Sequence, residues 1–93
     1  MNSKVETYIG FAIKKGSAVF GVDNIVKYRK KMYLLVATKS ISQRSLDALK
    51  DFADARGLTV VTVEDYPLLA QRNCKALAVC DKSLATAVIN NVK

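Results

Sequence analysis

Apolar residues near the start of the chain recur at intervals of three and four positions. This apolar stripe consists of Val5, Tyr8 or Ile9, Ala12 and Ile13. Such spacing places side chains on one face of an α-helix. Ser3 and Glu6 have the spacing of a capping box, which marks a helix start, and Gly16 interrupts the pattern. The sequence therefore predicts a first helix that ends before Gly16.

Short apolar runs alternate with helical patterns over the rest of the chain. Residues 17–20 predict a brief strand, and residues 32–39, 58–63 and 76–81 predict three more. The run 32–39, MYLLVATK, lacks polar alternation, as expected of a strand covered on both faces. Residues 58–63, LTVVTV, predict a second buried strand in the same way.

A basic segment with helical spacing follows the first predicted strand. Residues 20–32, FGVDNIVKYRKKM, predict a second helix with one apolar side and one charged side. Its predicted buried stripe is Val22, Ile25, Val26 and Met32, and its outward cations are Lys27, Arg29, Lys30 and Lys31. Cations along the flank of a helix start create a place where phosphate can sit, although a solvated charged surface would look the same.

Three more helices are marked by their ends. Ser40 with Gln43 repeats the capping-box spacing, and Gly57 provides a stop for that helix. Asp65 and Pro67 open a short helix before the last strand. The core positions of the long helix are Leu46, Leu49, Phe52 and Ala53. The last helix is capped by Asp81 or Ser83 and aligns Leu84, Val88 and Val92.

Helices that alternate with apolar strands predict a sheet that is covered on both faces. We expect an α/β protein, a three-layer α/β/α sandwich with a central mixed sheet, and one domain over residues 1–93. A chain of 93 residues that is 51% hydrophobic can bury one modest core. No apolar run reaches the length of a membrane span, and the first residues lack the apolar segment of a signal peptide. These features predict a cytoplasmic protein with two reduced thiols, Cys74 in a loop and Cys80 in a strand.

The basic residues are unevenly distributed along the chain. The net charge is +7, and nine of the 15 basic residues but only two of the eight acidic ones lie in residues 1–45. All of the excess positive charge therefore belongs to the first half of the sequence. Such asymmetry indicates a one-sided positive potential that attracts polyanions, chiefly nucleic acid or an anionic membrane.

The residue types needed for catalysis and metal binding are scarce. The chain has no histidine, so neither cysteine has one to deprotonate it and no zinc site can be completed. Three carboxylates share the polar side of one predicted helix: Asp47, Asp51 and Asp54. Ser40 beside Lys39, and Ser83 beside Lys82, fit helix caps better than a nucleophile with its base. We expect no enzyme, no cofactor, no catalytic residue and no metal site.

Four segments, in this order, resemble a known family. They are residues 9–21 (IGFAIKKGSAVFG), the G-x-x-x-x-x-K spacing from Gly21 to Lys27, residues 33–42 (YLLVATKSIS) and residues 68–85 (LLAQRNCKALAVCDKSLA). Over nearly its whole length the chain resembles the kink-turn RNA-binding ribosomal proteins, the archaeal L-seven-Ae and eukaryotic L-thirty-e type, and especially their small bacterial members. The resemblance implies RNA as the partner, ribosomal RNA included, with further proteins of a ribonucleoprotein.

The resemblance also implies where the RNA binds. In that family a G-x-N-E-x-x-K motif at the start of the second helix reads tandem sheared G·A pairs in a kinked RNA. By position, Gly21 matches the glycine, Asp23 the asparagine, Asn24 the glutamate and Lys27 the lysine. Asp23 and Asn24 are departures. Asn24 still donates and accepts at a base edge but lacks the charge of a carboxylate, and Asp23 can accept hydrogen bonds or cap the helix.

The residues themselves also favour RNA at this place. A glycine turn lets the backbone of Gly21 and Val22 approach a ligand, the helix start offers N–H donors, and Lys27 lies one turn further on. The ends that carry Lys14, Lys15 and Lys39 are expected to converge on the same edge of the sheet. For any one of Lys14, Lys15, Lys30 and Lys31, attraction to the C-terminal end of a helix is the better explanation. For the cluster as a whole, together with the net charge of this half of the chain, nucleic acid is favoured.

A second expected contact is the loop before the last strand, which in the family packs against a flipped-out base. The loop residues are Arg72, Asn73, Cys74 and Lys75. Cys74 would make the apolar contact and Arg72 or Lys75 a phosphate contact; a polar connector with Asn73 at a helix end is the alternative. Tyr28 and Tyr33 offer rings for base stacking, although packing against the core is the usual role of such residues.

We therefore predict an RNA-binding domain that recognises a kink-turn or related bent helix, as a ribosomal or ribosome-associated protein. The alternative is a protein-interaction module whose basic face docks an acidic partner, since the same charges would permit it. No membrane partner is expected.

Overall fold

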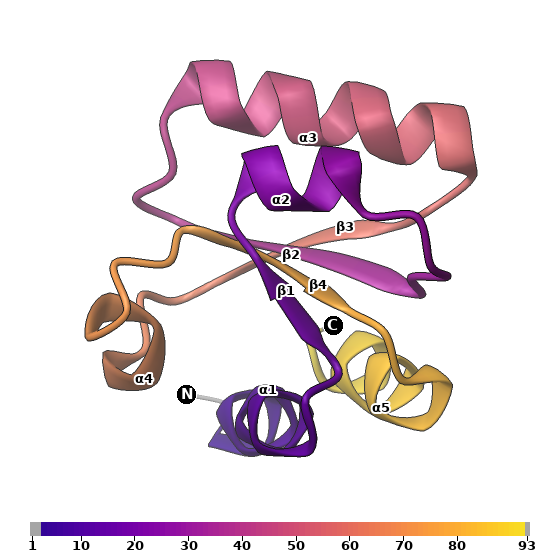
Figure 1. The fold of residues 1–93 in the computed structure, drawn as a ribbon. Helices are drawn as coiled ribbons and strands as arrows, with labels where there is room; N and C mark the ends of the chain where they lie inside the picture. The colour runs from indigo at the N-terminus through magenta and orange to yellow at the C-terminus, as the bar shows by residue number, and fades with distance from the viewer. Residues whose placement is uncertain (1–2, 93) are drawn as a thin grey trace.

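The computed structural model describes residues 3–92 and places a four-stranded mixed sheet between two layers of helices (Figure 1). The predicted three-layer α/β/α class is confirmed. The elements are α1 (Ser3–Lys15), β1 (Ala18–Phe20), α2 (Val22–Lys27), β2 (Leu34–Thr38), α3 (Gln43–Arg56), β3 (Val60–Val63), α4 (Pro67–Ala70), β4 (Ala76–Val79) and α5 (Lys82–Asn91).

The strands lie in the order β1-β4-β2-β3, and β4 runs against the other three. It pairs antiparallel with both β1 and β2, whereas β2 and β3 are parallel. The C-terminal ends of β1, β2 and β3 therefore meet the start of β4 at one end of the sheet, which we call the Gly21 end. The starts of those three strands and the end of β4 lie at the opposite end, which we call the Tyr33 end.

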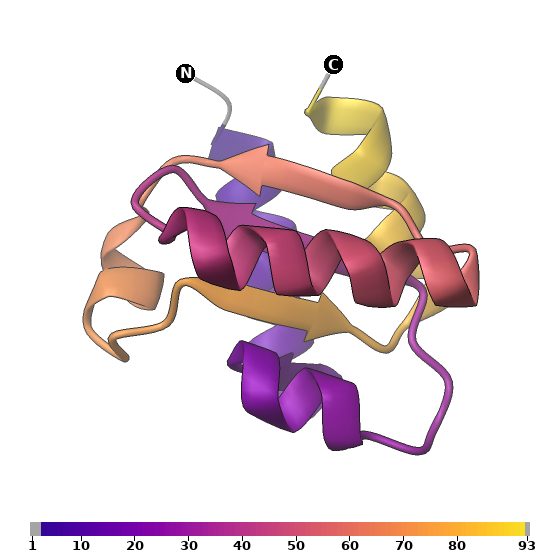
Figure 2. The same ribbon diagram turned by 90° about the horizontal axis from the view of Figure 1, so that it is seen from above.

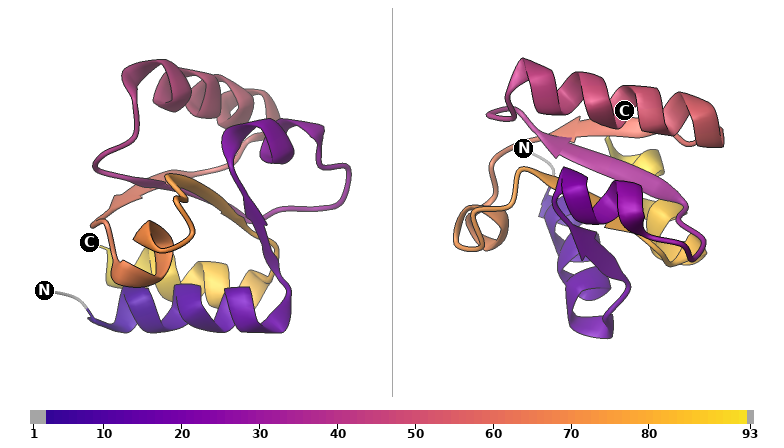
Figure 3. Two further views of the ribbon diagram at one scale, coloured as in Figure 1. Left: turned by 60° about the vertical axis from the view of Figure 1, so that its left-hand side comes forward. Right: turned by 45° about the horizontal axis from the view of Figure 1, so that its top comes forward.

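Each face of the sheet has its own apolar core. Helices α1 and α5 lie side by side under one face, where Ile9 and Val88 are fully buried (Figure 3). Helices α2 and α3 cover the other face, where Ile25 and Leu49 are fully buried (Figure 2). The apolar β2 run is buried at every position, as its lack of alternation predicts.

The ends of the helices show which capping predictions were correct. Gly57 closes α3 in the left-handed conformation at φ 67°, and Asp81 caps α5 by accepting the Leu84 N–H at 3.0 Å. The predicted start of α3 was two residues too early. The N-cap is Ser42 rather than Ser40, and its side chain accepts a hydrogen bond from the N–H of Ser45 at 3.2 Å. The capping role expected of Ser3 lies outside the side chains that the structure describes.

The second helix is shorter than the sequence predicted. It ends at Lys27 because Tyr28 is extended, with ψ 131°, and the chain must then cross the Tyr33 end to enter β2. The apolar stripe was consequently wrong in part. Val26 is 42% exposed, and Met32 is buried from a loop rather than from the helix.

Two strand predictions need correction as well. Residues 58–63 were expected to form a buried strand, but β3 lies at the edge of the sheet and buries only Val63. Cys80 lies just beyond β4 rather than in it, although its N–H still donates to the Ser17 carbonyl at 2.8 Å. Both Cys74 and Cys80 are free thiols, as predicted.

Candidate nucleic-acid interface

A hollow of about 460 Å³ opens at the Gly21 end, between the start of α2, the loop after β2 and the segment before β4. Its lining residues are Gly21, Val22, Asp23, Asn24, Ser40, Ile41, Ser42, Ser45, Asn73, Lys75 and Ala76. We call this space the Gly21 hollow. Sheet topology brings the three segments together, because β1 and β2 end where β4 begins. Six of the lining residues were predicted as RNA contacts, and they come from two segments about 50 positions apart.

The backbone of Gly21 explains why glycine occupies this turn. Its φ of 86° and ψ of 146° fall in a region that residues with a Cβ rarely adopt. The Gly21 N–H donates to the Ala76 carbonyl at 2.8 Å, which fixes the turn against β4, and its own carbonyl accepts the Ile25 N–H at 3.0 Å. Val22 is half-buried and packs on the α2–α3 core.

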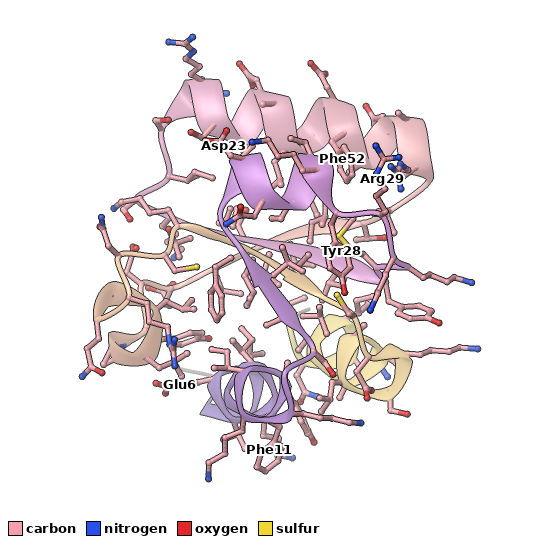
Figure 4. All side chains as sticks on the ribbon, in the orientation of Figure 1. Glu6, Phe11, Asp23, Tyr28, Arg29 and Phe52 are labelled. Atoms are coloured by element: carbon pink, nitrogen blue, oxygen red, sulfur yellow. The ribbon has the colours of Figure 1, made fainter. Side chains whose placement is uncertain are left out.

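Asn24 is held in one orientation at the rim of the hollow. Its Nδ2 donates one hydrogen bond to the Phe20 carbonyl at 2.8 Å, which leaves its Oδ1 as an acceptor and the second Nδ2 hydrogen as a donor for other partners. Asp23 beside it is exposed and also lines the hollow; Figure 4 shows it at the start of α2. Together these two side chains present hydrogen-bond acceptors, which suit the N–H groups of a guanine edge.

A cluster of polar side chains forms the opposite wall. Lys75 Nζ donates to Ser40 Oγ at 2.8 Å, and Ser40 in turn donates to Asp65. This hydrogen bond from Ser40 is the main reason why the pKa of Asp65 lies below its usual value. Thr38 is buried at the end of β2, and its Oγ1 lies 3.3 Å from the Oγ of Ser40.

Three serines that line this wall, Ser40, Ser42 and Ser45, were not predicted as site residues. Ser40 was interpreted as a helix cap, and Ser42 and Ser45 were given no role. Their position directly after β2 was the available signal, because β2 ends at the same end of the sheet as β1.

Two of the predicted cations at this end, Lys39 and Lys75, face carboxylates of the protein itself. Lys39 forms an ion pair with Glu64, with side chains that are 63% and 58% exposed, and this partner raises the pKa of Lys39. Lys75 reaches Asp65 through Ser40. The Gly21 hollow is therefore close to neutral and rich in hydroxyl and amide groups, rather than the strongly positive rim that the charge distribution suggested.

Lys14 and Lys15 do not converge on this site. Lys15 pairs with Asp81, which follows β4 and lies at the Tyr33 end. Lys14 lines a separate shallow hollow with Phe11 and Arg72, on the α1 side of the molecule. The prediction of one converging edge fails for these two lysines because α1 ends where β1 starts, one strand length away from Gly21.

The loop before β4 is divided between the surface and the core. Asn73 takes a left-handed conformation at φ 51° after α4 and also lines the Gly21 hollow, so both of its predicted roles are compatible. The Arg72 guanidinium lies 5.2 Å from the centre of the Phe20 ring. Cys74 is only 7% exposed and its thiol donates to the Ala76 carbonyl, while burial raises its pKa. The predicted contact of Cys74 with a flipped-out base is therefore not supported.

The remaining predicted residues lie outside the Gly21 hollow. Lys27 is exposed at the end of α2. Tyr28 and Tyr33 are half-buried and pack against the two cores, which is the ordinary role for such rings. A hydrogen bond with Cys80 raises the pKa of Tyr28.

Among residues 3–92 the structure has no helix with the length and apolarity that a bilayer crossing requires.

Comparison with known proteins identifies the fold alone. No protein-family model matches the sequence, and no curated protein matches it. The solved structure of a protein of unknown function from Bacillus halodurans is similar with a TM-score of 0.86, over 96% of each chain. At 15% sequence identity this neighbour supports the three-layer α/β architecture and carries no information on activity.

Proposed function

We propose that this protein binds structured RNA, a kink-turn or related bent helix, as a ribosomal or ribosome-associated protein of the cytoplasm. One observation carries the proposal. Residues 21–24 and the pair Asn73 and Lys75 were selected from sequence as RNA contacts, and they line one hollow although they are far apart in the chain. Two free thiols, one of them buried, suit a reducing compartment.

The chemistry of the Gly21 hollow favours contacts with base edges over contacts with phosphates. Asn24 Oδ1 and the Asp23 carboxylate accept hydrogen bonds, and the serine hydroxyls both donate and accept. Such groups distinguish bases and ribose hydroxyls, whereas phosphates are held mainly by cations. Lys27, one helical turn beyond Asp23, supplies a cation beside the hollow.

The near-neutral hollow also argues against an acidic protein as its ligand. An acidic partner needs unpaired cations, but Lys39 and Lys75 already face carboxylates and Asp23 adds another negative charge. A bent RNA can instead insert base edges here and place its phosphates on either side.

The experiment is a titration against a fluorescent kink-turn duplex and a straight duplex of equal length. We expect at least tenfold tighter binding to the kinked duplex. Asn24→Ala should reduce that preference about fivefold, which corresponds to one hydrogen bond of about 1 kcal/mol. Asn90→Ala, on the exposed side of α5, is the matched control and should leave the preference unchanged. Equal affinity of the unmodified protein for both duplexes would refute the proposed function.

A further inference from the structure

The Tyr33 end carries a second hollow of about 490 Å³, formed where β2 starts, α3 ends and α5 begins. Its lining residues are Lys31, Met32, Tyr33, Arg56, Gly57, Leu58 and Lys82. We call it the cationic hollow, because three of the seven lining residues are basic and none is acidic.

The cations of this hollow are not paired with carboxylates in residues 3–92. Lys31 Nζ lies 5.3 Å from the centre of the Tyr33 ring, and the Arg56 guanidinium carbon lies 4.9 Å from that of the Phe52 ring. The ion pair between Lys15 and Asp81 is also at the Tyr33 end, but neither of its residues lines the hollow, and the pair between Lys39 and Glu64 is at the Gly21 end. The cations of this hollow therefore lack the carboxylate partners that Lys39 and Lys75 have at the Gly21 end.

Helix dipoles explain only one of the three positions. Arg56 lies in the last turn of α3, where the partial negative charge of the helix end attracts a cation. Lys82 is the first residue of α5, where the helix dipole disfavours a cation. Lys31 belongs to no helix. Like charges around one space repel each other, and an anion between them would relieve that repulsion.

We propose that the cationic hollow binds phosphate groups of an RNA strand, as a second contact distinct from the Gly21 hollow. RNA as the occupant rests on the proposed function. Exposed cations connect the two regions: Lys27 ends α2, and Arg29 and Lys30 precede Lys31. Figure 4 shows Arg29 on the loop that leaves α2.

The dimensions of the molecule set the length of RNA that such a path requires. The largest extent is 29 Å, which a nucleic-acid strand covers in roughly eight nucleotides at about 3.4 Å each. A strand of twelve nucleotides is therefore long enough to reach the cationic hollow and the exposed cations beside it.

The test uses a labelled oligouridylate of twelve nucleotides, which cannot form a kink-turn. The double variant Lys31→Glu/Lys82→Glu is compared with Lys14→Glu/Lys50→Glu, which has the same net charge but alters exposed lysines elsewhere. We expect the first variant to lose at least fivefold more affinity than the control. Its log K against log salt slope should also become shallower by about 1.4, or about 0.7 for each lost phosphate contact. Circular dichroism verifies that both variants are folded.

Two outcomes would overturn the inference. Equal losses in the two double variants would indicate diffuse attraction without a site. Polyglutamate of the same charge that binds as tightly as the oligouridylate, with the same loss in Lys31→Glu/Lys82→Glu, would assign the hollow to an acidic protein. The titration of the kinked and straight duplexes tests the proposed function separately. The protein can bind both duplexes equally while Lys31→Glu/Lys82→Glu still weakens oligouridylate binding, and it can prefer the kinked duplex while that variant has no specific effect.

Discussion

Glu64 is predicted to weaken RNA binding at the Gly21 end. Its carboxylate holds the Lys39 ammonium, so a phosphate that approaches Lys39 must compete with an internal anion. Glu64→Gln removes that negative charge and keeps the size and polarity of the side chain. The variant should therefore bind a kink-turn duplex more tightly than the unmodified protein does.

The size of the gain follows from the exposure of the pair. The Lys39 and Glu64 side chains are 63% and 58% exposed, so their surroundings are nearly as polar as water. A unit charge about 7 Å from a phosphate then changes the binding constant by about threefold. If Lys39 gains a full phosphate contact, the salt slope should also steepen by about 0.7 to 0.9.

The assay is the same duplex titration, repeated at several salt concentrations, because screening conceals exposed charges above about 0.1 M salt. Asp51→Asn is the control, since it also replaces an exposed carboxylate with its amide but lies on α3 outside the Gly21 hollow. A gain that is equal in both variants would reflect net charge alone. No gain in Glu64→Gln would contradict the reasoning that Lys39 faces the RNA.

Three further predictions concern the fold. Gly57→Ala should lower the free energy of unfolding by about 1 kcal/mol, because φ is 67°, whereas Gly10→Ala inside α1 should raise it by about as much; urea denaturation measures both. The hydrogen bond from Lys15 lowers the pKa of Asp81 below its usual 3.8, so the stability that the Asp81 carboxylate contributes above pH 3.8 should be lost as the pH falls through the lowered pKa. The loss should be smaller in Asp81→Asn, and acid unfolding followed by circular dichroism measures it. Leu35→Ala, at a fully buried position in β2, should cost about 3 kcal/mol in the same urea assay.

The fold could be predicted from sequence wherever a local signal and the tertiary structure agreed. The αL stop at Gly57, the cap at Asp81 and the buried β2 run are such cases, because backbone sterics, one hydrogen bond and burial each act locally. The length of α2 was not predictable in this way. Residues 28–33 must connect the end of α2 to the start of β2 at the Tyr33 end, and this connection determines where α2 stops. The spacing of apolar residues contains no information on such a connection.

The prediction that β3 is a buried strand failed for a related reason, because β3 lies at the edge of the sheet. Val60 and Val61 have the composition of a buried strand, but strand order decides how many neighbours cover them. The Gly21 hollow, in contrast, depended on strand direction. Gly21 and Lys75 were selected separately from two motifs, and the antiparallel pairing of β1 with β4 placed them together.

The charge pattern shows most clearly what a linear sequence omits. The first half of the chain contains the whole net charge of +7, yet Glu64 and Asp65 from the second half lie against Lys39 and Lys75 at the Gly21 end. Parallel pairing of β2 and β3 forces this, because residues that follow the two strands must emerge side by side. The three cations of the cationic hollow, at the Tyr33 end, have no such carboxylate partner within residues 3–92. For the proposed RNA complex we therefore expect Asn24→Ala to change mainly the preference for the kinked duplex, and Lys31→Glu/Lys82→Glu to change mainly the salt dependence of binding.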